Sequence, residues 1–155
     1  MSTGKDSRTY ATRTVLFDRD GRVAVINVRK YDYYKIPGGG VEDGEELLSA
    51  ARREVSEEAG CDCEIVANLG RITTDVADWR MRDVSDGFIA KVVGEKRTPQ
   101  FDAQERARDF QLEWRDNLTV AIRDIEAHAV ADPATAAIQA RDLAFLKRAE
   151  KYLSQ

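Results

Sequence analysis

Gly39 to Cys61, with the sequence GGVEDGEELLSAARREVSEEAGC, is the stretch that decides how the rest of this chain is interpreted. A glycine-rich loop at 37–40 leads into it, and its spacing predicts a helix over 45–59. Glu54, Glu57 and Glu58 have the i, i+3, i+4 spacing that brings side chains to one helical face. Three adjacent carboxylates repel one another, and a divalent cation with oxygen ligands removes that penalty. Mg²⁺ or Mn²⁺ is therefore the expected cofactor.

The two ends of this helix carry their own signals. Asp43, followed three residues later by Glu46, predicts a capping box at the start, and Gly60 predicts the end. Apolar residues at helical spacing predict the buried stripe: Leu48, Ala51, Val55 and Ala59. The glutamates border this stripe, where a carboxylate needs a partner because burying an unpaired charge is costly.

Composition limits the possible partners and location. With 155 residues, we expect one domain over 1–155, with a flexible terminus at 1–9. A net charge of −4 argues against a nucleic-acid partner. The first residues lack a secretory apolar core, and no apolar run reaches the roughly 20 residues that span a membrane. Cys61 and Cys63 are poorly placed to bond each other, which is typical of a reduced cytoplasmic protein.

His128 is the only histidine in the sequence, which limits the kinds of metal site and catalytic site that are possible. One histidine cannot form a histidine-rich zinc site, and it argues against a Ser-His-Asp triad or a Cys-His dyad. Metal chemistry in this chain must therefore depend on carboxylates.

The remaining segments predict an α+β fold or a mixed sandwich. We expect strands over 12–17, 22–29, 61–69, 71–77, 87–93 and 110–114, and further helices over 117–127 and 135–153. An aromatic loop is expected at 31–34 and a polar loop at 94–108. Pro133 is expected to break the chain before the last helix.

The 39–61 stretch resembles a complete Nudix box. Gly39 is followed after five residues by Glu45, and after seven more by REVSEEAGC, which begins at Arg53. Every fixed position of the pattern is filled, which seldom happens by chance. The resemblance implies a Nudix fold, an α/β/α sandwich with a mixed sheet between helices. It also implies metal-dependent hydrolysis of a nucleoside diphosphate linked to another moiety.

The resemblance also implies roles for individual residues. By this resemblance, the metal is bound by the carbonyl of Gly38 and the carboxylates of Glu54, Glu57 and Glu58. Glu54, instead or in addition, orients the attacking water. Glu45 and Arg53 correspond to the pair that fixes the loop against the helix. Glu105, in the 94–108 loop, is the candidate for a further ligand or base, with an ordinary surface position as the alternative.

Several residues near the box are candidates for substrate binding. Arg29 and Lys35 flank the aromatic loop and would meet phosphates or remain solvated. Tyr34 would stack on a base or pack on the sheet edge. Gly39 and Gly40 allow a ligand to approach the backbone closely. Two further aromatics, Trp79 and Phe88, are better explained as core residues than as a base pocket.

The substrate is the least determined part of the interpretation. The chain has no proline between Pro37 and Pro99 and no tyrosine between Tyr34 and Tyr152, so it lacks markers of some subfamilies. The default expectation is a small-molecule substrate, a nucleoside triphosphate cut to a monophosphate and pyrophosphate. The alternatives are an ADP-ribose or nucleotide-sugar pyrophosphatase and a non-catalytic nucleotide sensor, although sensors usually have a degraded box. A monomer and a homodimer are both open.

Overall fold

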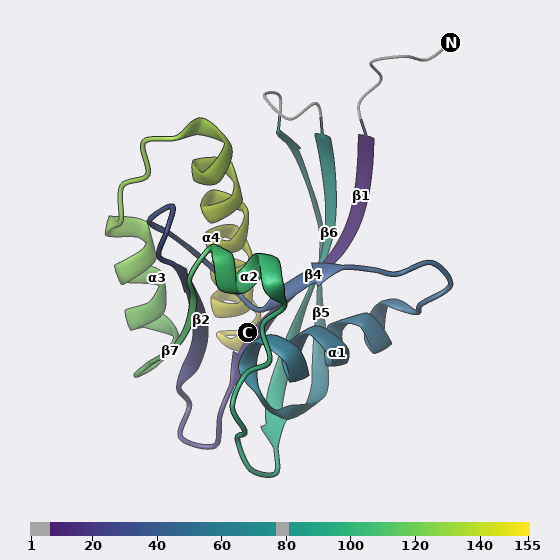
Figure 1. Ribbon diagram of the computed structural model, residues 1–155. Helices are drawn as coiled ribbons and strands as arrows, with labels where there is room; N and C mark the ends of the chain where they lie inside the picture. Colours follow the sequence, from purple (N-terminus) through teal and green to yellow (C-terminus); the bar gives the residue numbers. More distant parts are fainter. Residues whose placement is uncertain (1–6, 77–80) are drawn as a thin grey trace.

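The computed structural model describes residues 7–76 and 81–155 (Figure 1). The strands are β1 (Ser7–Phe17), β2 (Val23–Val28), β3 (Tyr33–Lys35), β4 (Gly38–Gly40), β5 (Asp62–Val76), β6 (Met81–Val93) and β7 (Phe110–Arg115). The helices are α1 (Leu47–Ala59), α2 (Ala103–Ala107), α3 (Leu118–Ala127) and α4 (Pro133–Leu153). Within these described ranges, no helix is both long and apolar enough to cross a membrane.

The described strands form one seven-stranded mixed sheet. Its order is β3-β2-β1-β6-β5, with β4 added to β1 and β7 added to β2. β1 runs parallel to β6 from Ser7 opposite Met81 to Phe17 opposite Lys91, and antiparallel to β4, where Arg13 lies opposite Gly38. This long central strand therefore joins both halves of the sheet.

The sheet is covered by helices on both faces. Val15 and Leu16 are consecutive and fully buried, yet they belong to different core clusters, because successive strand side chains point to opposite faces. The cluster around Val15 includes side chains of α3 and α4, and the cluster around Leu16 includes side chains of α1. Figure 1 shows α1 separated from α3 and α4 by the long strands. The predicted α/β/α sandwich is confirmed.

Several strands are longer than predicted. β1 starts at Ser7, so residues 7–9 belong to the sheet and not to a flexible terminus; the rest of that predicted terminus lies outside the described residues. β6 starts at Met81, six residues before the prediction of 87, because Asp83, Ser85 and Asp86 interrupt the apolar pattern that was used to place the strand. β5 is one strand where two were predicted, since its pairing with β6 continues through register shifts around Ala67 and Gly70. Ala77 and Trp79 lie outside the described residues.

Two predicted loops contain strands. The glycine run, predicted as a loop, forms β4, and the aromatic loop at 31–34 contains part of β3. β4 approaches β1 so closely that a Cβ at Gly38 would lie 2.0 Å from the carbonyl oxygen of Thr12. Glycine is required there because the two backbones leave no space for a side chain.

The ends of α1 are only partly as predicted. The capping box of Asp43 and Glu46 is wrong, because Glu46 is the N-cap residue and makes no side-chain cap hydrogen bond. Gly60 ends the helix with φ 66°, as predicted. Leu48 was expected in the buried stripe but is 42% exposed, since it lies in the first turn, away from the sheet. The other predicted members, Ala51, Val55 and Ala59, are buried.

The segment predicted as a polar loop contains α2. Asp102 and Glu105 form a capping box there, in which each side chain accepts from the backbone N–H of the other. Pro133 starts α4 at its first turn, where a missing N–H costs nothing, and does not simply interrupt the chain. α2 therefore fixes the place of Glu105.

We expect Phe145→Ala to lower the free energy of unfolding by about 3–5 kcal/mol, the usual cost of removing a buried aromatic ring. Phe145 is fully buried where α4 packs on the sheet. Leu153→Ala, at a position 54% exposed on the same helix, is the matched control and should change stability by about 0.5 kcal/mol or less. Denaturant unfolding measures both, and equal losses would contradict the assignment of α4 to the core.

Candidate active site

Main-chain atoms of β4 lie directly against the glutamate face of α1. An ideal Cβ at Gly39 would be 2.6 Å from Oε1 of Glu54, so any larger residue would displace that carboxylate. The N–H of Gly38 donates to Oε1 of Glu58 at 3.0 Å. The glycines of the box therefore allow the strand and the helical carboxylates to touch.

Arg53 connects the parts of this motif. Its Nε and Nη2 donate to the two carboxylate oxygens of Glu45 at 2.8 and 2.9 Å, and Nη2 also donates to the carbonyl of Gly40 at 2.9 Å. Its Nη1 donates to Glu54 at 2.9 Å and to Glu57 at 3.2 Å. The guanidinium lowers the pKa of Glu45 to about 2. Arg53 thus orients three carboxylates and one carbonyl of β4 at once.

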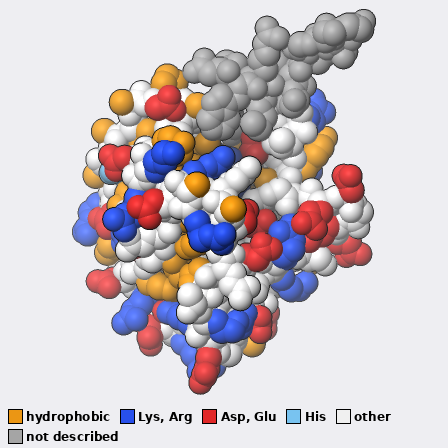
Figure 2. Space-filling model, viewed as in Figure 1, with side chains coloured by type: hydrophobic (Ala, Val, Ile, Leu, Met, Phe, Trp, Pro, Cys, Tyr) orange, Lys and Arg blue, Asp and Glu red, His pale blue; other side chains and the backbone are white. Residues whose placement is uncertain are grey.

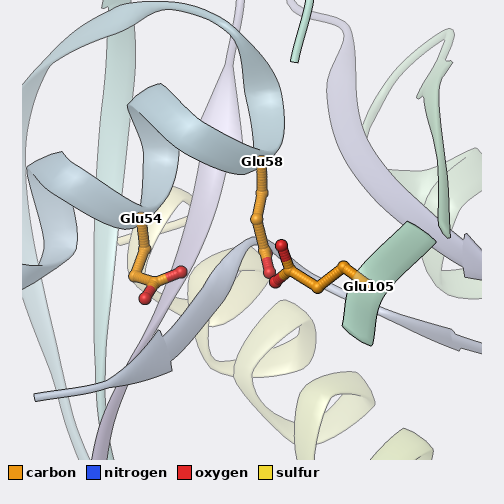
Figure 3. Close-up of side chains that lie close together, drawn as sticks. All are labelled: Glu54, Glu58 and Glu105. Carbon is orange, nitrogen blue, oxygen red and sulfur yellow. The ribbon is translucent and has the colours of Figure 1, made fainter. Parts of the chain in front are cut away.

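Three carboxylates meet beside this motif, and we call them the carboxylate group: Glu54, Glu58 and Glu105 (Figure 3). Each offers an oxygen, and these oxygens lie within 4.8 Å of one another. Glu54 and Glu58 come from α1, while Glu105 reaches them from α2. Figure 3 shows the carboxylates of Glu58 and Glu105 pointing toward each other.

The electrostatics of the carboxylate group suit a divalent cation. Burial, followed by the charge of Glu58, raises the pKa of Glu54 to about 6. Burial, followed by hydrogen bonding to Glu58, raises the pKa of Glu105 to about 8. In both carboxyls burial is the main cause of the raised pKa, and the neighbouring Glu58 adds to it. An all-oxygen donor set with uncompensated charge fits Mg²⁺ or Mn²⁺.

Lys35 supplies part of the compensation. Its ammonium donates to Oε1 of Glu58 at 2.8 Å and to the carbonyl of Gly38 at 3.1 Å, and its side chain is 7% exposed. The ammonium of Lys35 thus bridges the carbonyl of Gly38 and the carboxylate of Glu58, which are both predicted metal ligands. Lys35 was predicted to meet phosphates or to remain solvated; its ammonium is buried and donates to two of the predicted metal ligands.

Glu57 lies apart from the carboxylate group. Its side chain is 42% exposed and accepts from Arg53, whereas the carboxylates of Glu54 and Glu58 lie against β4. Its role as a metal ligand remains a prediction from the resemblance. Glu105, for which a plain surface position was the alternative, lies in the group.

A cavity of about 500 Å³ adjoins Glu58 and Glu105. Among the predicted substrate residues, Lys35, Gly39 and Gly40 line it. Arg29 and Tyr34 lie elsewhere: Arg29 donates to Gln111 at 2.7 Å, and the ring of Tyr34 packs edge-on against His128. The alternation of β3 places Tyr33, and not Tyr34, in the cavity wall.

Three buried charged residues that line the cavity were missed in the sequence: Arg13, Asp83 and Arg141. Arg13 and Asp83 stand inside long strands, and Arg141 stands on the buried side of α4. A charged residue inside a central strand was the available signal, because it must find a partner or a ligand. Figure 2 shows acidic and basic side chains gathered on the face formed by β4 and α1.

Carboxylates from two helices that meet beside a glycine strand and a cavity are the kind of site that metal-dependent phosphate hydrolases use. The model of the NUDIX domain matches residues 7–132. The chain belongs to the Nudix family.

Individual relatives support this membership. The RNA pyrophosphohydrolase of Novosphingobium aromaticivorans is 36% identical over 83 residues, which is 52% of this chain and 49% of the relative. The ADP-ribose pyrophosphatase of Methanocaldococcus jannaschii is 33% identical over 101 residues, covering 63% of this chain and 59% of that protein. The chain spans about half the length of the curated relatives it matches. A NUDIX hydrolase from Nitrosomonas europaea has the same fold, with a TM-score of 0.67, 18% identity and coverage of 96% and 90% of the two chains.

The Glu45–Arg53 pair should stabilise the protein in a pH-dependent way. The pKa of Glu45 falls from its ordinary 4.5 to about 2 on folding, so the unfolded state binds more protons between these values. The stabilisation is therefore present above pH 4.5 and is lost as the pH falls toward 2. We expect Glu45→Gln to be less stable than the wild type at pH 6, with a difference that shrinks between pH 4.5 and 2. Thermal unfolding across this range measures it, and a constant difference would contradict the pairing.

The carboxylate group should bind Mn²⁺ directly, and Glu105 should take part. We expect Glu105→Gln to weaken Mn²⁺ binding about 10-fold or more, the scale seen when metal-site carboxylates are altered. Glu150→Gln, on the exposed face of α4, is the charge-matched control and should bind like the wild type. Calorimetric titration of the purified protein gives both affinities. Equal weakening in both variants would mean that net charge, and not the group, determines binding.

Proposed function

We propose that this chain hydrolyses a phosphoanhydride bond in a nucleoside diphosphate linked to another moiety, with Mg²⁺ or Mn²⁺ as cofactor. The observation that carries the proposal is the carboxylate group, whose oxygens lie within 4.8 Å of one another beside a cavity of about 500 Å³. Cavities of this size accommodate small ligands of nucleotide dimensions. Membership of the Nudix family agrees with this chemistry.

The residues around the cavity have complementary tasks in this reaction. Glu54, Glu58, Glu105 and the carbonyl of Gly38 would hold the cation, with Glu57 as a further predicted ligand. The cation, when bound, supplies charge neutralisation of the diphosphate and a more acidic water. Glu54, whose pKa is about 6, is mainly ionised at neutral pH and can accept a proton from the attacking water. The water oxygen bonds to phosphorus, the bridging P–O bond breaks, and the proton passes through Glu54 to solvent.

The default substrate is a nucleoside triphosphate, which would give a monophosphate and pyrophosphate. A second candidate is ADP-ribose, because the Methanocaldococcus jannaschii relative with that name matches over 101 residues. RNA is a third substrate to test, since the Novosphingobium aromaticivorans relative is an RNA pyrophosphohydrolase, although the net charge of −4 argues against it. All three substrates contain the phosphoanhydride bond that the proposal requires.

A substrate panel tests the proposal. Nucleoside triphosphates, ADP-ribose, a nucleotide sugar and a 5′-triphosphorylated RNA would be incubated with Mg²⁺, Mn²⁺ or a chelator, and the products separated by chromatography. We expect metal-dependent turnover, with a nucleoside monophosphate and pyrophosphate from the triphosphates. No metal-dependent cleavage of any substrate would overturn the proposed function.

Two glutamate variants test the assignment of roles. We expect Glu54→Gln to lower kcat about 10²- to 10⁴-fold, because a group that accepts a proton in the transition state contributes on that scale. Glu57→Gln should abolish metal-dependent turnover without unfolding the protein. Glu64→Gln, exposed on β5, is the control for loss of one negative charge. Full activity in Glu57→Gln would remove Glu57 from the ligand set.

A further inference from the structure

Arg108 lines the cavity without an ion-pair partner among the described residues. Arg13, Lys35 and Arg141 also line the cavity, but each of them pairs with a carboxylate. The side chain of Arg108 is exposed, and its guanidinium forms no hydrogen bond in the part of the chain that the structure describes. Its positive charge is therefore available to a ligand, and the hydrolysis as described above gives it no task.

The short helix α2 brings Arg108 to the same side as Glu105. Arg108 is the C-cap residue of α2 and keeps right-handed helical backbone angles, so it follows Glu105 by three residues on one helical face. Its backbone is held from two directions, because its N–H donates to the carbonyl of Gln104 at 3.0 Å and its carbonyl accepts from the N–H of Lys30 at 3.2 Å. A fixed backbone therefore presents the guanidinium to the cavity that the carboxylate group adjoins.

The charge of Arg108 acts on the wall of the cavity. Tyr33 lines the cavity and is 6% exposed. Burial raises the pKa of its hydroxyl, and the positive charge of Arg108 is the largest influence that lowers it. The acidic neighbour of Arg108 does not offset this charge, since Asp109 pairs with Arg29 at 3.4 Å. The cavity thus has a free positive charge beside Tyr33, in addition to the carboxylate group.

A free guanidinium near a metal-binding group favours a ligand with more negative charge than the metal neutralises. A phosphate that is esterified on both sides carries about one negative charge at neutral pH, and a terminal phosphate carries about two. A divalent cation therefore balances the diphosphate of ADP-ribose but not the phosphates of a nucleoside triphosphate. The planar fork of arginine can donate two parallel N–H···O bonds to the oxygens of a terminal phosphate.

We propose that Arg108 binds the terminal phosphate of the substrate and favours nucleoside triphosphates over diphosphates that are esterified at both ends. The guanidinium donates to oxygens of the terminal phosphate, which then leaves within the pyrophosphate product. Arg108 is in this way a specificity-determining residue, and it takes no proton in the reaction. The inference rests on the proposed function, because it assumes that the ligand contains a phosphoanhydride bond.

Steady-state kinetics with ATP and ADP-ribose in Mg²⁺ test the proposal. We expect the ratio of kcat/KM for ATP to kcat/KM for ADP-ribose to fall about 10- to 100-fold in Arg108→Gln, because charge-assisted hydrogen bonds contribute on this scale. Arg108→Lys keeps the charge without the fork and should show a smaller fall, and it gives the test if Arg108→Gln fails to fold. A purely structural role would lower both values together and leave the ratio unchanged. Where the wild type cleaves only one of the two, calorimetry gives the affinity for the other, and the same contrast is expected.

Arg52→Gln is the matched control. Arg52 is likewise exposed and stands on α1, close to the site in sequence, but it does not line the cavity. We expect this variant to keep the wild-type ratio. The proposal would be overturned by a preference for ADP-ribose in the wild type, by an unchanged ratio in the folded Arg108 variants, or by an equal fall in Arg52→Gln.

Failure of the proposed function can be told apart from failure of this inference. If neither nucleotide is hydrolysed, calorimetry with ATP and with ADP-ribose in Mg²⁺ measures binding alone. Tighter binding of ATP, weakened in Arg108→Gln and kept in Arg52→Gln, supports recognition of the terminal phosphate without hydrolysis. Equal binding of the two nucleotides, or no binding, overturns the recognition as well. Hydrolysis with an unchanged ratio in the Arg108 variants leaves the proposed function intact and removes only Arg108.

Discussion

The guanidinium of Arg53 is the interaction on which the rest of the site depends. Its planar set of donors joins Glu45 before the helix, the carbonyl of Gly40 on β4, and Glu54 and Glu57 on α1. Arginine suits this position because five N–H groups in a fixed fork can satisfy several oxygens at once, and a lysine ammonium has neither the number nor the geometry. Through these bonds, the glycine strand and the glutamate helix keep one relative position.

The carboxylate group and the buried charged residues Arg13, Asp83 and Arg141 occupy two parts of the cavity with different charge. Near the carboxylates, buried negative charge exceeds what Lys35 compensates, and the pKa of both Glu54 and Glu105 rises. Among Arg13, Arg141, Asp83 and Asp142, by contrast, two positive and two negative groups balance. One cavity thus has a strongly negative part and an electrically balanced part.

Local patterns in the sequence predicted those features that depend on near neighbours. The spacing from Gly39 to Gly60 predicted α1 and its end, because helical periodicity and a left-handed glycine act within a few residues. The same local argument failed at the helix start, where Glu45 binds Arg53 and the predicted box of Asp43 and Glu46 does not form. Tyr34 was the predicted candidate, but Tyr33 lines the cavity, a shift of one residue that a strand converts into a change of face.

Features that depend on distant pairing could not be predicted in this way. Arg13 and Asp83 meet because β1 and β6 run parallel in one register, and Arg141 joins them from the last helix. Nothing near any of these three residues in the chain indicates the other two. Glu105 was an intermediate case: its residue type suggested a ligand, but its place depends on the short helix α2 and its capping box. The mixed sheet itself was predicted only through the resemblance.

The pairing of β1 with β4 has a consequence for ligand binding. Arg13 and Gly38 are partners across this antiparallel ladder, so a buried arginine of the cavity and the carbonyl beside the carboxylate group belong to adjacent, hydrogen-bonded backbones. Their separation is set when the sheet forms, and no segment between them has to become ordered when a ligand arrives. The conformational entropy of assembling this part of the site is therefore lost during folding, which leaves more of the contact energy available for affinity and for alignment of the reacting bond.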